Sequence, residues 1–532
     1  MSAVQFCLSA IFQIDQKARV LMFKGLKCRA LELGKTLLAF STVLGLAGGL
    51  NVASLQSVLA ADQYFYIKPY LQLGFDGKKD SAGLDIVWFS DEAKHKWQVK
   101  FVTAGGKEAE AEWITERMIS LPGFTAPYYK LTAHIHKIAS GDTFDYKVLR
   151  DGNKVFEATA NARKSAGQSS QVAIFGDCGI NGEAQRKLAQ QVSAGNPDLV
   201  IIPGDIAYQY GLFSQYVSNF FPVYNLDAAR VAEKDSETSA KSAATTPGVP
   251  LMRSIPFVGI IGNHDIALSG MTGTNLNRFP DALAYFVFWN QPLNGFTPSK
   301  EFENKNFPFL AGDPNRQELF KKSAGDAFPT MSNFSFDFGE AHYTCLDGNY
   351  YMDWTNPKLR EWLANDLKGA QSKTWRIISM HQPGFLLGAA HAEEQKMRLI
   401  SDIAQKYNVN LVVAGHSHCY ERSYPLTFDP KPGLKSFTQN ADGTVDGVLT
   451  LDKVYDGKKT TKPKGIIYVV SGAGGANIYP IDKASVSAPN SFIDKYDSSG
   501  RSYSALEIDS KQLTFKQISE DGKVIDKFIV SK

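Results

Sequence analysis

The sequence predicts a small all-β sandwich followed by a larger α/β domain. Residues 63–165 contain short segments of alternating hydrophobicity between Gly, Asp and Ser turns, which is typical of an antiparallel sandwich. From residue 171 onward, continuous apolar runs alternate with helical patterns, as expected of strands buried on both faces. We therefore expect domains at 62–167 and 168–532, with the C-terminal strands belonging to the second.

Residues 1–61 have the features of a leader with a secretory signal. They carry six basic and two acidic residues, an uncharged apolar run over 36–50, and small residues ending in SVLAAD. We expect cleavage near Ala61, export to the periplasm or the cell exterior, and no transmembrane anchor in the mature chain. An uncleaved membrane anchor is the alternative interpretation.

The α/β part is built from five apolar runs and three helical patterns. The runs are VAIFGD, LVIIPGD, FVGIIGNHD, RIISMHQP and VNLVVAGHSH, and the helices are expected at 182–194, 358–370 and 393–407. Residues 228–254 are small and polar and predict an exposed insertion, whereas 266–333 are expected to form long loops. Short strands return after residue 447.

Composition excludes several classes of function. The chain has 532 residues, 44% of them hydrophobic, with 57 basic and 54 acidic side chains. This near balance disfavours a dedicated binder of nucleic acid or anionic membranes, so no specific nucleic-acid partner is expected. Five cysteines are too few for a disulfide-built scaffold.

Each of the five apolar runs ends in side chains that can bind a metal: Asp177, Asp205, Asn263 with His264, His381, and His416 with His418. Ligand sites in α/β sheets lie beyond the carboxyl ends of the strands. One such residue means little, because Gly-Asp is common turn chemistry, but five are hard to attribute to chance. We expect these side chains to converge on one crevice.

The donor types indicate two metal ions. Two carboxylates, an amide oxygen, three imidazoles and a phenol exceed the needs of one tetrahedral zinc. They suit two ions roughly 3.5–4 Å apart with one bridging carboxylate, an arrangement that polarises phosphoryl groups and generates a hydroxide nucleophile. The sequence therefore predicts a hydrolase.

The motifs GDCG, GDIAY, GNHD, SMHQP and GHSH closely resemble those of the calcineurin-like metallophosphoesterases, and among them the purple acid phosphatases. Ordinary members have Asp-x-His in the first motif, whereas this chain has Gly179 in place of the His. Purple acid phosphatases lack that His and have a Tyr three residues after the second Asp, which is Tyr208 here. The resemblance covers roughly residues 65–532 and implies a fibronectin type III-like sandwich before an αββα metallophosphoesterase domain.

The resemblance also implies a ligand set for each ion. Fe(III), which a hard phenolate ligand favours, would be held by Asp177, Tyr208 and His418. A second, divalent ion (Fe, Zn or Mn) would be held by Asn263, His381 and His416, with Asp205 bridging. The activity implied is an acid phosphatase that cleaves phosphate monoesters by attack of a metal-bound hydroxide.

Three further residues are candidates for catalysis. By the resemblance, His264 would face the phosphate, and Asp265 could fix its tautomer. His391 lies where some relatives carry a second substrate-facing His; an exposed His at the start of a helix is the alternative. Cys178 and Cys419 each follow a proposed iron ligand, and we expect two buried thiols rather than a disulfide between them.

Two other functions stay open. A phosphodiesterase or nucleotidase of the same superfamily would share every metal ligand, and its substrate would also be a phosphoester. A non-catalytic binding protein that uses the sandwich is a more distant alternative, against which the complete ligand set argues.

Overall fold

The structure, a computed structural model, describes residues 64–74, 83–91, 94–124, 126–136, 138–226, 246–267, 273–297, 308–388, 390–480 and 482–532. The predicted leader and most of the predicted insertion at 228–254 lie outside these residues. Within the described ranges, no helix combines the length and apolarity needed to cross a membrane.

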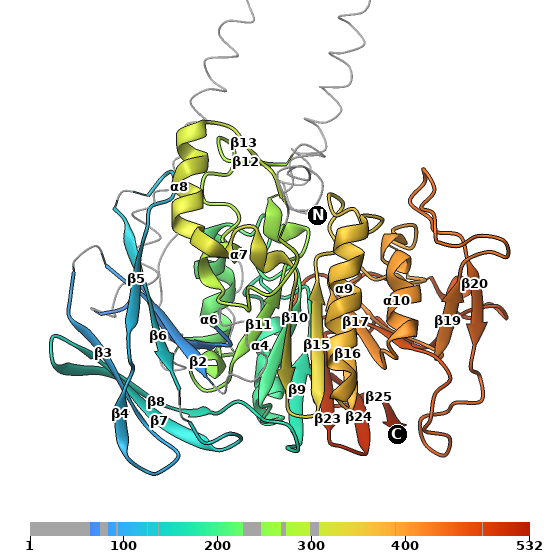
Figure 1. Ribbon diagram of the computed structural model, residues 1–532, viewed down its shortest axis with the longest axis horizontal. Helices are drawn as coiled ribbons and strands as arrows, with labels where there is room; N and C mark the ends of the chain where they lie inside the picture. The colour runs from blue at the N-terminus through green and yellow to red at the C-terminus, as the bar shows by residue number, and fades with distance from the viewer. Residues whose placement is uncertain are drawn as a thin grey trace, which may run out of the picture. The chain divides into compact units, whose positions relative to one another are not determined.

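The N-terminal part is the predicted β-sandwich, with two antiparallel four-stranded sheets of order β1-β2-β6-β5 and β4-β3-β7-β8 (Figure 1). The strands are β1 (Ile67–Gln72), β2 (Leu84–Ser90), β3 (Trp97–Val102), β4 (Glu108–Glu110), β5 (Ile114–Ile119), β6 (Tyr128–Ile135), β7 (Thr143–Arg150) and β8 (Asn153–Asn161). Trp88 and Leu131 from the first sheet share one buried cluster with Val99 and Val148 from the second. Alternating side chains thus close the sandwich, as the sequence pattern predicts.

The α/β part contains two mixed sheets. The first has the order β11-β10-β9-β23-β24-β25 and the second β14-β15-β16-β17-β21-β18-β22. The parallel strands are β9 (Ser170–Ile174), β10 (Leu199–Pro203) and β11 (Phe257–Ile260) in the first, and β15 (Ala341–Leu346), β16 (Trp375–Met380), β17 (Leu411–Ala414) and β21 (Ile467–Ser471) in the second. The antiparallel strands are β14 (Phe334–Phe338), β18 (Tyr420–Ser423), β22 (Ile493–Asp497), β23 (Ser502–Ile508), β24 (Gln512–Ser519) and β25 (Val524–Ser531). The five apolar runs are therefore divided between two sheets.

The two sheets pack face to face between outer helices. Ile174 of the first sheet and Ile377 of the second belong to one buried cluster, whereas their chain neighbours Ala173 and Ile378 belong to another. That second cluster includes apolar residues of α4 (Glu183–Ala194), α9 (Pro357–Gly369) and α10 (Ser401–Lys406). This alternation between adjacent residues gives the expected αββα layering, and Figure 1 shows α9 and α10 beside β15–β17.

The expected long loops over 266–333 contain regular structure, so that expectation is wrong in part. The described elements there are β12 (Thr274–Asn275), α7 (Tyr285–Phe288), β13 (Leu310–Ala311) and α8 (Pro314–Ala324). Asp313 caps α8 by accepting hydrogen bonds from two backbone N–H groups, and Pro314 opens its first turn. The expected helix at 393–407 is shorter than predicted, with a 3₁₀ turn over Lys396–Ile400 before α10.

Several short elements complete the chain: α5 (Phe213–Gln215), α6 (Phe221–Tyr224), β19 (Leu426–Asp429), β20 (Val448–Leu451) and α11 (Lys483–Val486).

Candidate metal centre

Four predicted ligands from both sheets meet in a first cluster, made of Asp177, Asp205, Tyr208 and His418. The phenol oxygen of Tyr208 lies 3.2 Å from Asp177 Oδ1, 3.1 Å from Asp205 Oδ2 and 3.0 Å from His418 Nε2. Donor atoms about 2.0–2.2 Å from a common ion, at right angles to one another, are themselves about 3 Å apart. The spacing and the donor types of this cluster therefore fit a metal ion.

A second cluster lies on the other side of Asp205. His381 Nε2 is 2.8 Å from Asn263 Oδ1, 3.2 Å from Asp205 Oδ1 and 3.2 Å from His416 Nδ1. Asp205 thus directs Oδ2 to the first cluster and Oδ1 to the second. A carboxylate with this placement fits a bridge between two ions.

The imidazoles of both clusters are oriented by bonds on their far sides. His381 Nδ1 lies 2.9 Å from the carbonyl oxygen of Pro203, and His418 Nδ1 lies 2.7 Å from that of Asn477. A carbonyl only accepts, so in each ring Nδ1 donates its proton there and Nε2 is the nitrogen that faces the cluster. Both rings are therefore held in the orientation that a metal requires.

The backbone at three of these residues is in the left-handed region. Asp177, Asp205 and His416 have φ values of 61°, 50° and 73°. Non-glycine residues there are strained and are held by their surroundings, here by the His416 N–H donating to Asp177 Oδ2 over 2.9 Å. Gly472 packs closely against the site and has no room for a side chain, because an added Cβ would lie 2.8 Å from Asp177 Oδ2. Gly472 thus allows the chain to pass close to Asp177.

The site is buried, and its charged side chains shift one another's pKa values strongly when no metal is bound. Burial favours the neutral acid of Asp205, but His381 and His264 hold its pKa well below the usual range. Burial opposes protonation of His381, yet Asp205 and Asp177 raise its pKa to about 10. Burial and the same two carboxylates raise the pKa of Tyr208 far above its ordinary value. A cation placed among these groups would stabilise the two carboxylates and favour deprotonation of the phenol and the imidazoles.

Two family models match the chain. Residues 170–420, which carry every proposed metal ligand, match the calcineurin-like phosphoesterases, and residues 465–527 match the iron/zinc purple acid phosphatase-like protein C family. The chain therefore contains a calcineurin-like phosphoesterase domain. Its C-terminal strands are of the purple acid phosphatase-like kind.

Individual relatives of this phosphoesterase are distant. Purple acid phosphatase 23 of Arabidopsis thaliana is 24% identical over 270 residues, which cover 49% of this chain and 50% of the relative. "Probable inactive purple acid phosphatase 1" of the same plant is 22% identical, over 77% of this chain and 59% of the relative. The chain thus spans about half the length of the curated relatives that it matches.

Among solved structures, a purple acid phosphatase from yellow lupin (Lupinus luteus) seeds has a TM-score of 0.58 at 18% identity. The match covers 87% of this chain and 74% of that one. At this identity the likeness shows a shared fold.

The structure places His264 beside the clusters but corrects the predicted role of Asp265. His264 Nδ1 donates to the carbonyl oxygen of Gln209 over 2.7 Å, and this bond fixes its tautomer. Asp265 instead accepts from the N–H groups of Gly262 and Ile206, at 2.9 and 3.2 Å. Its carboxylate therefore holds the ligand-bearing loops together, and burial and nearby Asp205 raise its pKa to about 7.

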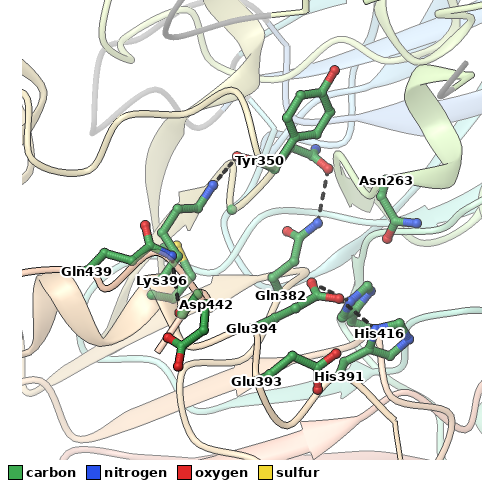
Figure 2. Close-up of a pocket in the computed structure, with 14 residues that line it drawn as sticks. Asn263, Tyr350, Gln382, His391, Glu393, Glu394, Lys396, His416, Gln439 and Asp442 are labelled. Carbon is green, nitrogen blue, oxygen red and sulfur yellow. Dashed lines mark hydrogen bonds and ion pairs between the residues drawn. The ribbon is translucent and has the colours of Figure 1, made fainter. Parts of the chain in front are cut away.

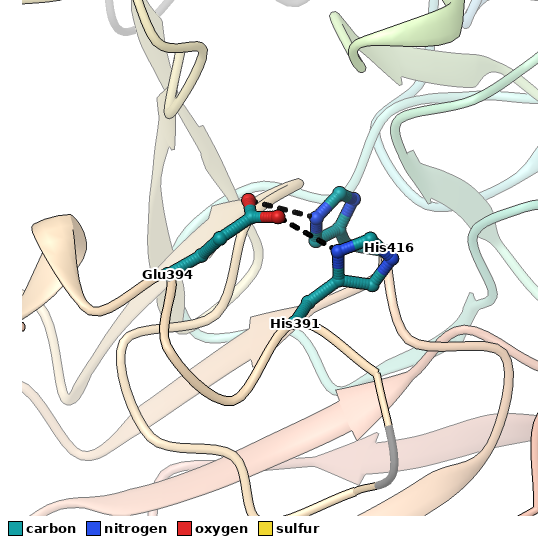
Figure 3. A group of neighbouring side chains, drawn as sticks. All are labelled: His391, Glu394 and His416. Atoms are coloured by element: carbon teal, nitrogen blue, oxygen red, sulfur yellow. Dashed lines mark hydrogen bonds and ion pairs between the residues drawn. The ribbon is translucent and has the colours of Figure 1, made fainter. Parts of the chain in front are cut away.

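His391 lies against the second cluster, which contradicts the alternative of an exposed His at the start of a helix. Its ring centroid is 3.9 Å from that of His416, and Glu394 joins the two rings (Figure 3). Glu394 Oε1 is 2.7 Å from His391 Nδ1, and Oε2 is 3.1 Å from His416 Nε2. The bond to Glu394 leaves His416 Nδ1 for the second cluster. Sequence reasoning missed Glu394, whose only signal is its place three residues after His391.

A cavity of about 600 Å³ adjoins the second cluster. Figure 2 shows Asn263 and His416 across it from Lys396, with Tyr350 and Gln382 between. Its size suits a small-molecule ligand. None of the wall residues beyond the metal ligands and His391 was predicted, because they come from separate loops.

The three described cysteines, Cys178, Cys345 and Cys419, are buried free thiols. The expected pair of buried thiols beside the proposed iron ligands is therefore confirmed.

Proposed function

We propose that this chain is an exported, dinuclear-metal phosphomonoesterase of the purple acid phosphatase type. The observation that carries the proposal is the placement of Asp205, whose two carboxylate oxygens face two separate clusters of metal-binding atoms. The family membership and the pattern of residues 1–61 support the reaction class and the export, respectively.

The donor chemistry supports different ions in the two clusters. The phenol of Tyr208 with two carboxylates favours Fe(III), whereas the amide and imidazoles of the second cluster suit a divalent ion such as Fe, Zn or Mn. When bound, such a pair polarises a phosphoryl group and activates water at the pH of the reaction.

Side chains around that pair would bind the phosphate of the substrate and protonate the departing alcohol. His264 Nδ1 donates its proton to the Gln209 carbonyl, and Nε2 faces the first cluster, 3.8 Å from Asp205 Oδ2, where it can contact a phosphate oxygen. In its protonated form, Nε2 can give its proton to the oxygen of the departing alcohol. Glu394 fixes the ring of His416 and accepts from His391, which contributes a second imidazole to the cavity wall.

The test is hydrolysis of p-nitrophenyl phosphate by the metal-loaded protein, with bis(p-nitrophenyl) phosphate as the diester. We expect faster turnover of the monoester, and a loss of roughly a hundredfold or more for Asp205→Ala because the bridge is removed. Glu116→Gln, an exposed change on the sandwich, should leave turnover intact. Undiminished activity of Asp205→Ala, or preference for the diester, would contradict the proposal.

A further inference from the structure

We propose that the cavity beside the second cluster selects phosphate monoesters of alcohols that carry an ammonium group, and disfavours polyanionic esters. The inference rests on the proposed function and names its substrate class. It follows from the charge and hydrogen-bonding capacity of the cavity wall away from the metal ligands.

The wall is rich in carboxylates. Glu393, Glu394 and Asp442 line the cavity, and Lys396 is the single lysine or arginine among the described lining residues. The amine of Lys396 is already engaged, because it donates to the carbonyl oxygen of Asn349. Glu394 is paired with His391 and His416, but three carboxylates against one ammonium still give the ionised side chains of this wall a net negative charge.

An unused acceptor in the wall points the same way. Gln382 is 7% exposed, and its Nε2 donates to Asn349 Oδ1 over 3.0 Å. Its Oε1 is buried and has no hydrogen-bond partner within the part of the chain that the structure describes. Buried polar atoms are normally paired, so Gln382 keeps one unused acceptor in the cavity wall, and a ligand N–H group that reached it would complete the pairing. Phosphate and carboxylate oxygens only accept and cannot do so.

The aromatic ring of Tyr350 adds a surface that suits a cation. It lines the cavity and is 40% exposed, so its face is open to a ligand. Ammonium groups are attracted to such ring faces. The phosphate of a substrate would lie at the metal clusters, so its alcohol would extend past Gln382 toward these groups (Figure 2). An ester with several phosphates would instead bring further negative charge against the carboxylates.

The experiment compares kcat/KM of the metal-loaded enzyme at low ionic strength for three esters. They are O-phosphoethanolamine, glycerol 2-phosphate and inositol hexakisphosphate, whose alcohols are cationic, neutral and polyanionic. We expect that order of preference, with steps of about tenfold, because one charge near the cavity carboxylates is only partly screened. Equal rates, or faster turnover of the polyanion, would overturn the inference. No turnover of any ester would instead overturn the proposed function.

A charge-neutralising variant identifies the residues responsible. Glu393→Gln combined with Asp442→Asn should reduce the preference for phosphoethanolamine over glycerol 2-phosphate to about threefold or less. Glu116→Gln on the sandwich should leave the tenfold preference unchanged. An unchanged preference in the double variant would overturn the inference. Should that variant not fold, raising the salt for the wild-type enzyme to 0.5 M should shrink the preference by screening, and a salt-independent preference would count against it.

Discussion

At the scale of single residues, the phenol of Tyr208 determines the character of the first cluster. It lies within 3.2 Å of donor atoms from Asp177, Asp205 and His418, and burial and those carboxylates keep it protonated without a metal. A strongly Lewis-acidic ion bound here would displace the phenol proton, and the Tyr208 oxygen that now donates hydrogen bonds to the carboxylates would then be a ligand.

Tyr208→Phe tests this assignment. The ring packs on that of His264 with centroids 4.6 Å apart, and phenylalanine would keep that contact. We expect the iron-loaded wild type to show a visible phenolate-to-Fe(III) absorption band, and the variant to lack it. An identical visible spectrum in the folded, iron-loaded variant would contradict the assignment.

Some residues of the candidate site can be predicted from the sequence, and others cannot. The seven proposed ligands each lie just beyond an apolar strand, so the strand pattern together with the family resemblance was sufficient to single them out. The predicted role of Asp265 in fixing the tautomer of His264 was wrong, because His264 Nδ1 bonds the carbonyl oxygen of Gln209 in another loop. Glu394 and Gln382 were missed, since their places in the wall depend on loop paths that periodicity does not encode.

At the scale of elements, local patterns predicted strands and helices better than their pairing. β9, β10 and β11 form a parallel set, but they share their sheet with β23–β25 from the far end of the chain. Such non-local pairing leaves no mark in a strand that is buried on both faces. The helix α8 was missed even though Asp313 and Pro314 provide a recognisable N-terminal signal.

A buried histidine links three elements, β14, β15 and α9, and predicts that stability depends on pH. His342 on β15 bonds Asp337 of β14 at 2.7 Å and Asp366 of α9 at 2.9 Å. Burial lowers its pKa, but the two carboxylates outweigh burial and raise the pKa above the ordinary value. A raised pKa stabilises the fold below the ordinary value of about 6.5, and that contribution is lost as pH rises through the folded-state pKa.

His342→Gln should therefore lower the free energy of unfolding more at pH 5.5 than at pH 9. Removing one partner of a buried ion pair typically costs about 3–5 kcal/mol, and we expect that range at the lower pH. Urea denaturation at both pH values measures the difference. A cost that is the same at both, or larger at pH 9, would show that the protonated ring does not stabilise the fold.

At the scale of the whole molecule, buried hydrogen bonds join the sandwich to the α/β part. Lys130 of β6 donates to the carbonyl oxygen of Val287 over 2.7 Å and to Asn290 Oδ1 over 2.6 Å. Asn290 in turn donates to Asp85 Oδ2 over 3.0 Å. These groups are buried, so their mutual pairing is what makes the contact stable.

Lys130→Met should destabilise the protein by about 3 kcal/mol, because it leaves two buried acceptors, the carbonyl oxygen of Val287 and Oδ1 of Asn290, without their hydrogen-bond donor. Lys147→Met is the matched control, since Lys147 makes only an exposed ion pair with Glu108 and should cost less than about 1 kcal/mol. Urea midpoints give both values. Equal, small effects would mean that this network does not secure the two parts.

For the whole molecule, the proposed function depends on a pair of metal ions joined by Asp205. Elemental analysis of the purified protein, after loading with iron and zinc and removal of unbound metal, measures whether that pair forms. We expect two ions per chain, one of them iron, and fewer than two in Asp205→Ala. One ion per chain in the wild type, or two in the variant, would contradict it.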